Sequence, residues 1–181
     1  TDIYKSDQAF TQGQMITVTG IDNLNEWWID PDFFEKQSDG ALKFLPINGD
    51  YRVTANAVLK YFSVMALKDG KPAKLQDDGT GAIWAIGKGI GKPSVTSSEV
   101  GWEPSKALCL AQVASKKYQL TLKAGETLKT SGDPEVISFK FFHQNDWGGE
   151  FGNYASSILV EQLKLADSGN LEMQDNKAFE E

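Results

Sequence analysis

Apolar and polar residues alternate in several short runs of the chain, and this two-residue period restricts the fold more than any other feature. Successive side chains of a β-strand point to opposite faces, so each run predicts a strand with one buried face. Turn residues such as those at 48–50 and 68–72 separate the runs, which is typical of a sandwich or a barrel. The runs cover residues 15–19, 51–55, 61–65, 118–122 and 137–141.

A weak internal repeat divides this predicted all-β fold. We expect two tandem immunoglobulin-like or carbohydrate-binding-module-like β-sandwich modules, the first shortened, over residues 1–74 and 75–181. One continuous sandwich with chance similarity is the alternative. After residue 173 no apolar run closes the second sheet, so we expect a further strand or domain in the parent protein. Sliding the chain by about 67 positions aligns Ile16 with Ile83, Gly20 with Gly87, Tyr51 with Tyr118 and Thr54 with Thr121.

The charge balance restricts the partner. The chain has 18 Lys plus Arg against 25 Asp plus Glu, a formal net charge of −7. Nucleic acids are bound mainly through cationic contacts to phosphate, so we expect no nucleic-acid partner and favour a neutral ligand. We expect no cofactor. The single cysteine, Cys109, lies in an apolar run and has no second cysteine to pair with, which predicts a buried, inert thiol.

The aromatic content predicts a ligand for exposed rings. The chain has five Trp and ten Phe residues, more than a core of this size usually requires. Trp102 lies in a turn before Pro104, and Trp147 lies among Gly148, Gly149 and polar neighbours. Neither has an obvious core to enter, whereas Trp84 lies in an apolar run that predicts a core position.

Lys140 is predicted to lie beside these two rings. It alternates with Phe139 and Phe141, so burial of the phenylalanines exposes Lys140 on the opposite face. Such a surface is suited to binding sugars, because their apolar C–H faces stack on indole while their hydroxyl groups need positioned polar partners. Lys140, Gln144 and Asn145 are the candidate partners, with Asp146 beside them. Burial of ~100 Å² at each ring contributes about 2.5 kcal/mol, which predicts micromolar to millimolar affinity. The alternative places both tryptophans in the core.

Trp27 and Trp28 form a second aromatic candidate. Adjacent strand residues point to opposite faces, so one ring is expected to stay exposed unless a neighbour covers it. Trp28 is a candidate ligand-binding residue, and the alternative is that this pair marks the contact between the modules.

Other motifs carry weaker signals. Residues 87–93 are rich in Gly and Lys but lack the spacing of a phosphate-binding loop, so we expect a flexible surface turn. The clusters Asp30-Pro31-Asp32 and Asp77-Asp78-Gly79 are weak calcium candidates, because turns favour Asp for their own reasons; we predict no metal site. The lone His143 and the absence of a Gly-x-Ser-x-Gly motif argue against acyl transfer. Asp146 and Glu150 leave a glycosidase as a minor alternative.

The C-terminal half resembles a known family in several short motifs. The resemblance runs through Ile83, Trp102, Tyr118, residues 139–141 and 147–151, and ends at 169–171. Residues 39–44 and 49–53 resemble a shortened, divergent copy. These motifs are similar to the glycan-binding modules of Bacteroidetes outer-membrane lipoproteins of the SusE/SusF type, which belong to polysaccharide-utilisation loci. The resemblance implies that Trp102, Lys140 and Trp147 hold the sugar.

The sequence as a whole predicts a non-enzymatic protein that binds an oligosaccharide or polysaccharide and supports glycan capture and uptake. The resemblance implies a cell-surface or outer-membrane location, with leader and lipid anchor absent from this sequence; secretion is the alternative. Outer-membrane transporter components are candidate partners. No run approaches the ~20 apolar residues that span a bilayer. The other hypotheses are a structural or adhesive interaction module and, less favoured, a glycoside hydrolase.

Overall fold

The computed structural model describes residues 2–130, 137–150, 163–165 and 170–173. It is all-β, as predicted, and its antiparallel sheets are compatible with β-sandwich modules. Internal contacts divide the chain into two compact units. Unit 1 contains Thr1–Ala82 and Cys109–Thr121, and unit 2 contains Ile83–Leu108 and Leu122–Glu181. Within the described residues, no helix has the length and apolar character needed to cross a membrane.

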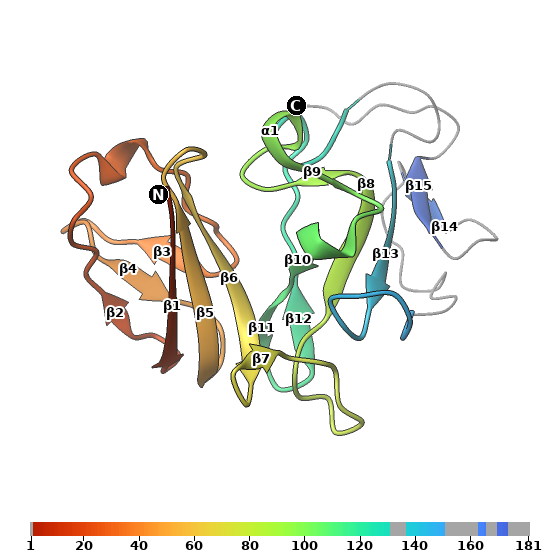
Figure 1. Ribbon diagram of the computed structural model, residues 1–181, viewed down its shortest axis with the longest axis horizontal. Coiled ribbons are helices and arrows are strands. Elements are labelled where there is room, and N and C mark those ends of the chain that lie inside the picture. The colour runs from red at the N-terminus through yellow and green to blue at the C-terminus, as the bar shows by residue number, and fades with distance from the viewer. Residues whose placement is uncertain (1, 131–136, 151–162, 166–169, 174–181) are drawn as a thin grey trace. The chain divides into compact units, whose positions relative to one another are not determined.

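Unit 1 contains a four-stranded antiparallel sheet with the order β1-β5-β6-β7 (Figure 1). Its middle strands show the predicted alternation. Tyr51, Phe62 and Val64 face the core and are buried, whereas Arg52 and Ser63 lie on the other face. The strands are β1 (Ile3–Phe10), β5 (Gly49–Asn56), β6 (Tyr61–Lys68) and β7 (Lys71–Pro72).

A three-stranded sheet in the order β2-β4-β3 lies beside the four-stranded sheet (Figure 1). Aromatic side chains of the two sheets pack in one core. Phe44 lies 4.7 Å from Phe10 and 4.8 Å from Tyr51, measured between ring centroids. Trp27 packs on Phe62 at 4.8 Å. Each buried ring of this kind contributes about 1.5–3 kcal/mol, so these contacts hold the two layers together. The elements are β2 (Met15–Ile16), the short helix η1 (Leu24–Glu26), β3 (Phe34–Lys36) and β4 (Leu42–Phe44).

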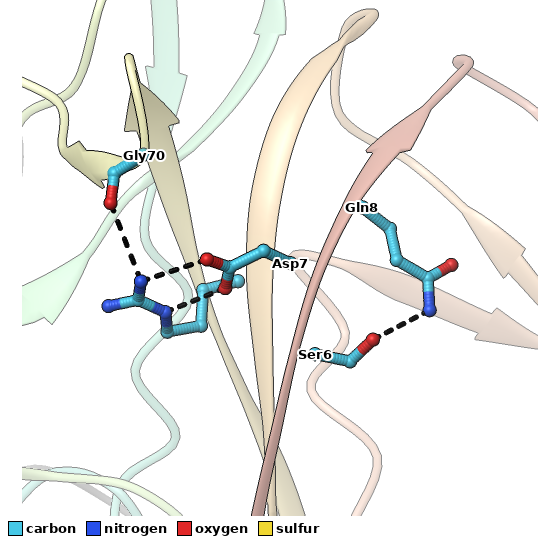
Figure 2. Close-up of polar contacts among 5 residues, drawn as sticks. Ser6, Asp7, Gln8 and Gly70 are labelled. Atoms are coloured by element: carbon cyan, nitrogen blue, oxygen red, sulfur yellow. Dashed lines mark hydrogen bonds and ion pairs between the residues drawn. The ribbon is translucent and has the colours of Figure 1, made fainter.

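The solvent face of the four-stranded sheet carries a cross-strand ion pair. Asp7 of β1 lies opposite Arg52 of β5, and its carboxylate accepts two hydrogen bonds from the guanidinium at 2.7 and 2.9 Å. Figure 2 shows this pair, with the guanidinium also reaching the Gly70 carbonyl of the β6–β7 turn. Ser6 and Gln8 share the opposite face of β1, where their side chains are hydrogen-bonded at 2.7 Å. The Asp7–Arg52 pair thus links the edge strand to its neighbour.

A hairpin from later in the chain completes unit 1. It consists of β11 (Ala111–Ala114) and β12 (Lys117–Gln119). Ala111 is fully buried in the aromatic core, and the Gln112 carbonyl accepts the Ile47 N–H at 2.8 Å. Sequence alternation predicted a strand near 118–122 but not its place in the fold, because this hairpin contacts residues as distant as Asp32, which is 87 positions before Gln119.

The larger antiparallel sheet has the order β10-β8-β13-β15-β14, with β9 pairing to β8, and all of it except Cys109 of β10 belongs to unit 2. Trp84, Ile86 and Phe139 are buried in it, and the predicted core position of Trp84 is confirmed. Cys109 is also buried, as predicted. The elements are β8 (Trp84–Gly91), α1 (Val95–Ser98), β9 (Glu99–Gly101), η2 (Pro104–Lys106), β10 (Leu108–Cys109), β13 (Ser138–Phe142), β14 (Leu163–Leu165) and β15 (Leu171–Met173).

The prediction of a flexible turn at 87–93 is wrong. Residues 87–91 lie inside β8 and are buried except for Lys88. Gly87 pairs with Phe139 and with Gly101, and a Cβ at Gly87 would lie 2.3 Å from the Ser138 carbonyl oxygen. Glycine is therefore needed at position 87 because the neighbouring strand backbone lies so close. The glycine-rich composition that resembles a loop comes from this tight strand packing.

The internal repeat does not describe two equivalent units. Tyr118 and Thr121 were aligned with Tyr51 and Thr54, yet all four residues belong to unit 1. The aligned residues thus occupy the same unit because the 109–121 segment packs with the N-terminal strands. The predicted module bounds, 1–74 and 75–181, are a separate prediction, and it divides the chain at one point along the sequence. Residues 174–181, after which we expect a further strand or domain in the parent protein, lie outside the described residues.

Candidate functional site

Trp102 is placed by a tight connection between β9 and η2. Gly101 ends β9 with a φ of 60°, a left-handed conformation that turns the chain. Pro104 begins η2 two residues after Trp102, where its fixed φ suits the start of a helical turn. The Trp102 side chain is half-buried on this connection.

Trp147 lies on a closed loop that follows β13. The His143 N–H donates to the Gly149 carbonyl at 2.7 Å, and Phe142 forms a bridge with Glu150. Gly148 and Gly149 have φ values of 88° and 64°, so the loop needs glycine at the position of its turn. The ends of the loop are therefore fastened to one another.

Further hydrogen bonds hold the tip of the loop. The Trp147 N–H donates to Asp146 Oδ1 at 2.8 Å, and the Gln144 side-chain amide donates to the Trp147 carbonyl. These bonds fix the backbone on both sides of the indole.

The two indole rings stack on each other. Their centroids are 6.2 Å apart with an interplanar angle of 26°, and we call Trp102 and Trp147 the tryptophan platform. The Trp147 ring also packs at 72° against Phe142, which is completely buried, at a centroid distance of 5.9 Å. Trp147 nevertheless remains 48% exposed. One ring thus supports the other, and the outer indole presents apolar surface to solvent.

Lys140 is less accessible than the sequence analysis expected. Its Nζ lies 3.1 Å from Glu150 Oε2, and only 15% of its side chain is exposed, against 48% for Glu150. Both faces of β13 carry buried residues here, so strand alternation does not leave Lys140 in open solvent. A ligand hydroxyl that uses Lys140 has to share the ammonium with Glu150.

The other candidate binding residues occupy different environments. Gln144 and Asn145 are half-buried on the Trp147 loop, and Gln144 already supports the loop backbone. Trp28 belongs to unit 1, where its ring packs on Tyr61 at 6.3 Å and its backbone N–H donates to the Lys60 carbonyl. Its neighbour Trp27 is buried in the core, so Trp28 is the more exposed ring of that pair.

The acidic clusters have structural partners. The buried Asp32 carboxylate accepts hydrogen bonds from Gln119 Nε2 at 2.9 Å and from the N–H and hydroxyl of Thr121, both at 2.7 Å. Asp78 accepts the Thr80 N–H and hydroxyl within one turn, which lowers the pKa of its carboxyl group. Across the described ranges, no three His, Cys, Asp or Glu side chains are grouped to hold a metal ion.

The carboxylates proposed for a glycosidase have partners of their own. Asp146 caps the Trp147 N–H, and Glu150 pairs with Lys140. These contacts give both acids a role in holding the loop in place.

Comparison with protein families matches the chain in two parts. The family described as "Domain of unknown function (DUF5121)" matches residues 78–181, more than half of the sequence. The chain belongs to the DUF5121 family. A second family, "Domain of unknown function (DUF5125)", matches residues 1–75. No curated protein and no solved structure matches the chain.

The DUF5121 region includes the entire tryptophan platform and also residues 109–121. By internal contacts, however, residues 109–121 belong to unit 1 with the DUF5125 region. The family match therefore assigns residues 109–121 to the C-terminal region, whereas the internal contacts assign them to unit 1.

Sequence reasoning missed two contacts, one at the tryptophan platform and one in unit 1. It did not pair Lys140 with Glu150, although residues of opposite charge on either side of a short loop were a usable signal. It also did not detect the contact of Asp32 with residues 119–121, because nothing local to Asp32 indicates a partner so far along the chain.

Proposed function

We propose that the chain binds an oligosaccharide or polysaccharide without transforming it, by stacking sugar rings on the tryptophan platform. The observation that carries this proposal is the exposed Trp147 ring, stacked on Trp102 and held on a hydrogen-bonded loop. A preorganised aromatic surface loses little conformational entropy on binding. The apolar face of a pyranose is its natural complement.

Charge supports a neutral glycan as the ligand. The platform is flanked by Asp146 and Glu150, and the nearby Lys140 is already paired with Glu150. The whole chain has a net charge of −7. Anionic polymers would meet repulsion from this surface, whereas a neutral saccharide needs only apolar contact and hydrogen bonds.

A glycan array followed by isothermal titration tests the proposal. Neutral oligosaccharides are expected to bind with micromolar to millimolar dissociation constants, because one platform buries a small apolar area. Trp147→Ala is expected to remove binding while the fold is retained. Full binding by this variant, or no response to any glycan, would reject the proposed site.

We propose a cell-surface, outer-membrane location, with secretion as the alternative, and a role in delivering glycans to transporter components. The support is the resemblance of residues 139–141 and 147–151 to SusE/SusF-type motifs. Surface labelling of intact cells that express the full-length protein tests the location.

A structural or adhesive function is the second candidate, and one feature of unit 1 favours it. Strand β1 forms an edge of its sheet and exposes Ile3 and Tyr4 to solvent. Exposed sheet edges accept strands from other chains. Capture of a purified transporter component, without any glycan response, would favour this function over saccharide binding.

A further inference from the structure

Unit 1 contains a pocket of about 550 Å³ that the tryptophan platform does not line. Its walls come from the start of β5, the β6–β7 hairpin, the loop at 74–81 and Gln112 of β11. We call it the unit 1 pocket. Its volume falls within the roughly 300–1,000 Å³ typical of small-molecule sites, so it can hold a small ligand.

The apolar part of the unit 1 pocket is formed by buried side chains. Tyr51 and Leu67 are buried, and the Tyr51 hydroxyl donates to the Ile47 carbonyl at 2.7 Å. Burial raises the pKa of the Tyr51 phenol, consistent with an apolar setting. Tyr51 is the one aromatic residue lining the pocket in the described chain, and its ring is covered, so this pocket lacks an open stacking surface.

Specific contacts fix the wall formed by the 74–81 loop. Gln112 is buried, and its Nε2 donates to the Gly79 carbonyl at 3.3 Å. The Tyr118 hydroxyl donates to the same carbonyl at 2.9 Å. A Cβ at Gly81 would lie 1.9 Å from the Lys74 carbonyl oxygen, so the loop closes tightly on itself. The pocket is therefore a defined feature of the fold.

Three charged side chains at the pocket are available to a ligand. Asp50, Lys68 and Lys74 line it and are exposed, and within the described residues their side chains make no hydrogen bond or ion pair. By contrast, the Asp78 carboxylate is engaged by Thr80. A carboxylate and two ammonium groups around an apolar floor complement a molecule that carries both charges and an apolar body.

We propose that the unit 1 pocket binds a zwitterionic ligand of the amino-acid or short-peptide class. The ligand carboxylate pairs with Lys68 and Lys74, its ammonium group pairs with Asp50, and an apolar side chain covers Leu67. A neutral saccharide fits less well, because the unpartnered groups are charged and no open ring face lines the pocket. This site is independent of glycan binding at the tryptophan platform.

Titration calorimetry of the full chain with trileucine and trialanine tests the proposal. The same peptides with acetylated and amidated ends provide the matched ligands. Free peptides are expected to bind, and blocking both ends is expected to weaken binding by about tenfold or more, because charge-assisted hydrogen bonds are lost. Trileucine is expected to bind more tightly than trialanine.

Variants locate the binding. Asp50→Asn and Lys74→Met are each expected to weaken peptide binding by roughly tenfold. Lys71→Met is the control, because Lys71 is an exposed lysine of β7 outside the pocket lining. Trp147→Ala is expected to leave peptide binding unchanged, which separates this proposal from the glycan proposal.

Several results would overturn the proposal. They are equal binding of free and blocked peptides, unchanged binding by Asp50→Asn and Lys74→Met, and no heat of binding with free peptides at about 10 mM. Binding of a neutral disaccharide that Asp50→Asn abolishes would assign the pocket to sugars instead.

Discussion

The Asp32 carboxylate accepts both the backbone N–H and the hydroxyl of Thr121, each at 2.7 Å, across 89 positions of the chain. Gln119 adds a third hydrogen bond at 2.9 Å. Asp32 is completely buried. One side chain thus fastens the end of the 109–121 segment to the loop before β3, which makes it important for the integrity of unit 1.

Asp32→Ala is expected to lower the free energy of unfolding by about 2–4 kcal/mol, because three hydrogen bonds to a buried carboxylate are lost. Chemical denaturation followed by circular dichroism measures the change. Asp78→Ala is the matched control, since its carboxylate bonds only within one exposed turn, and is expected to cost less than about 1 kcal/mol. Equal losses in the two variants would contradict the role given to Asp32.

Trp147→Ala and Trp102→Ala are both expected to weaken glycan binding by at least about tenfold. The first removes the exposed ring, and the second removes the ring that supports it. Titration calorimetry with the best glycan from the array measures the loss. Tyr4→Ala removes a ring in unit 1 that is more exposed than Trp147, and this variant is expected to bind like the unmodified chain. A loss confined to Tyr4→Ala would place the site elsewhere.

The Lys140–Glu150 pair is expected to respond asymmetrically to substitution. Lys140→Met keeps the apolar stem and leaves Glu150 able to rehydrate, so the free energy of unfolding should change by less than about 1 kcal/mol. Glu150→Gln leaves a largely buried ammonium without its charged partner and should cost more, about 1–2 kcal/mol. Urea denaturation of the two variants measures the difference. The reverse order would show that Lys140 does not depend on Glu150.

Gly87→Ala is expected to destabilise the chain by more than about 3 kcal/mol, or to prevent folding. The added Cβ would meet β13 backbone atoms at 2.3 and 2.4 Å, at a φ of 145°. Gly101→Ala is the control, because its φ is 60° but no atom lies within 4 Å of the added Cβ. It should cost about 1 kcal/mol. Thermal denaturation of both variants measures the two losses of stability, and their difference separates the effect of steric overlap from that of backbone strain.

Alkaline pH is expected to destabilise unit 1. Burial raises the pKa of Tyr118 to about 12, so its phenol keeps a proton that the unfolded chain loses near pH 10. The stabilisation is fully present below about pH 10 and disappears as the pH rises through the folded value. Denaturation from about pH 9 to about pH 12, with tyrosinate absorbance, measures this fall. Tyr118→Phe should make the fall shallower, and an unchanged slope would assign it to other groups.

The sequence was informative where one strand has one buried face. Alternation located β5, β6 and β13, because Tyr51, Phe62 and Phe139 enter the core. It also assigned Trp84 to the core. It failed at β8, whose glycines resemble a loop in composition, because close backbone approach between strands has no local signature.

For the candidate site, too, the sequence indicated individual residues but not their contacts. Chemistry and neighbouring glycines singled out Trp102 and Trp147, but their separation of 45 positions gives no information on contact. The structure stacks the rings at 6.2 Å and pairs Lys140 with Glu150. The unit 1 pocket had no sequence signal, because its walls come from four separate parts of the chain.

The sequence by itself determined the all-β class and several strands, and it singled out the candidate ligand-binding residues, because side-chain alternation and residue chemistry are local properties. Only the tertiary structure decided that residues 109–121 pack with unit 1 and that the two tryptophans form one platform. These contacts depend on which segments, distant in the sequence, bury the most surface against one another. Asp32 and Thr121 are one example, since neither residue's sequence neighbours indicate the other.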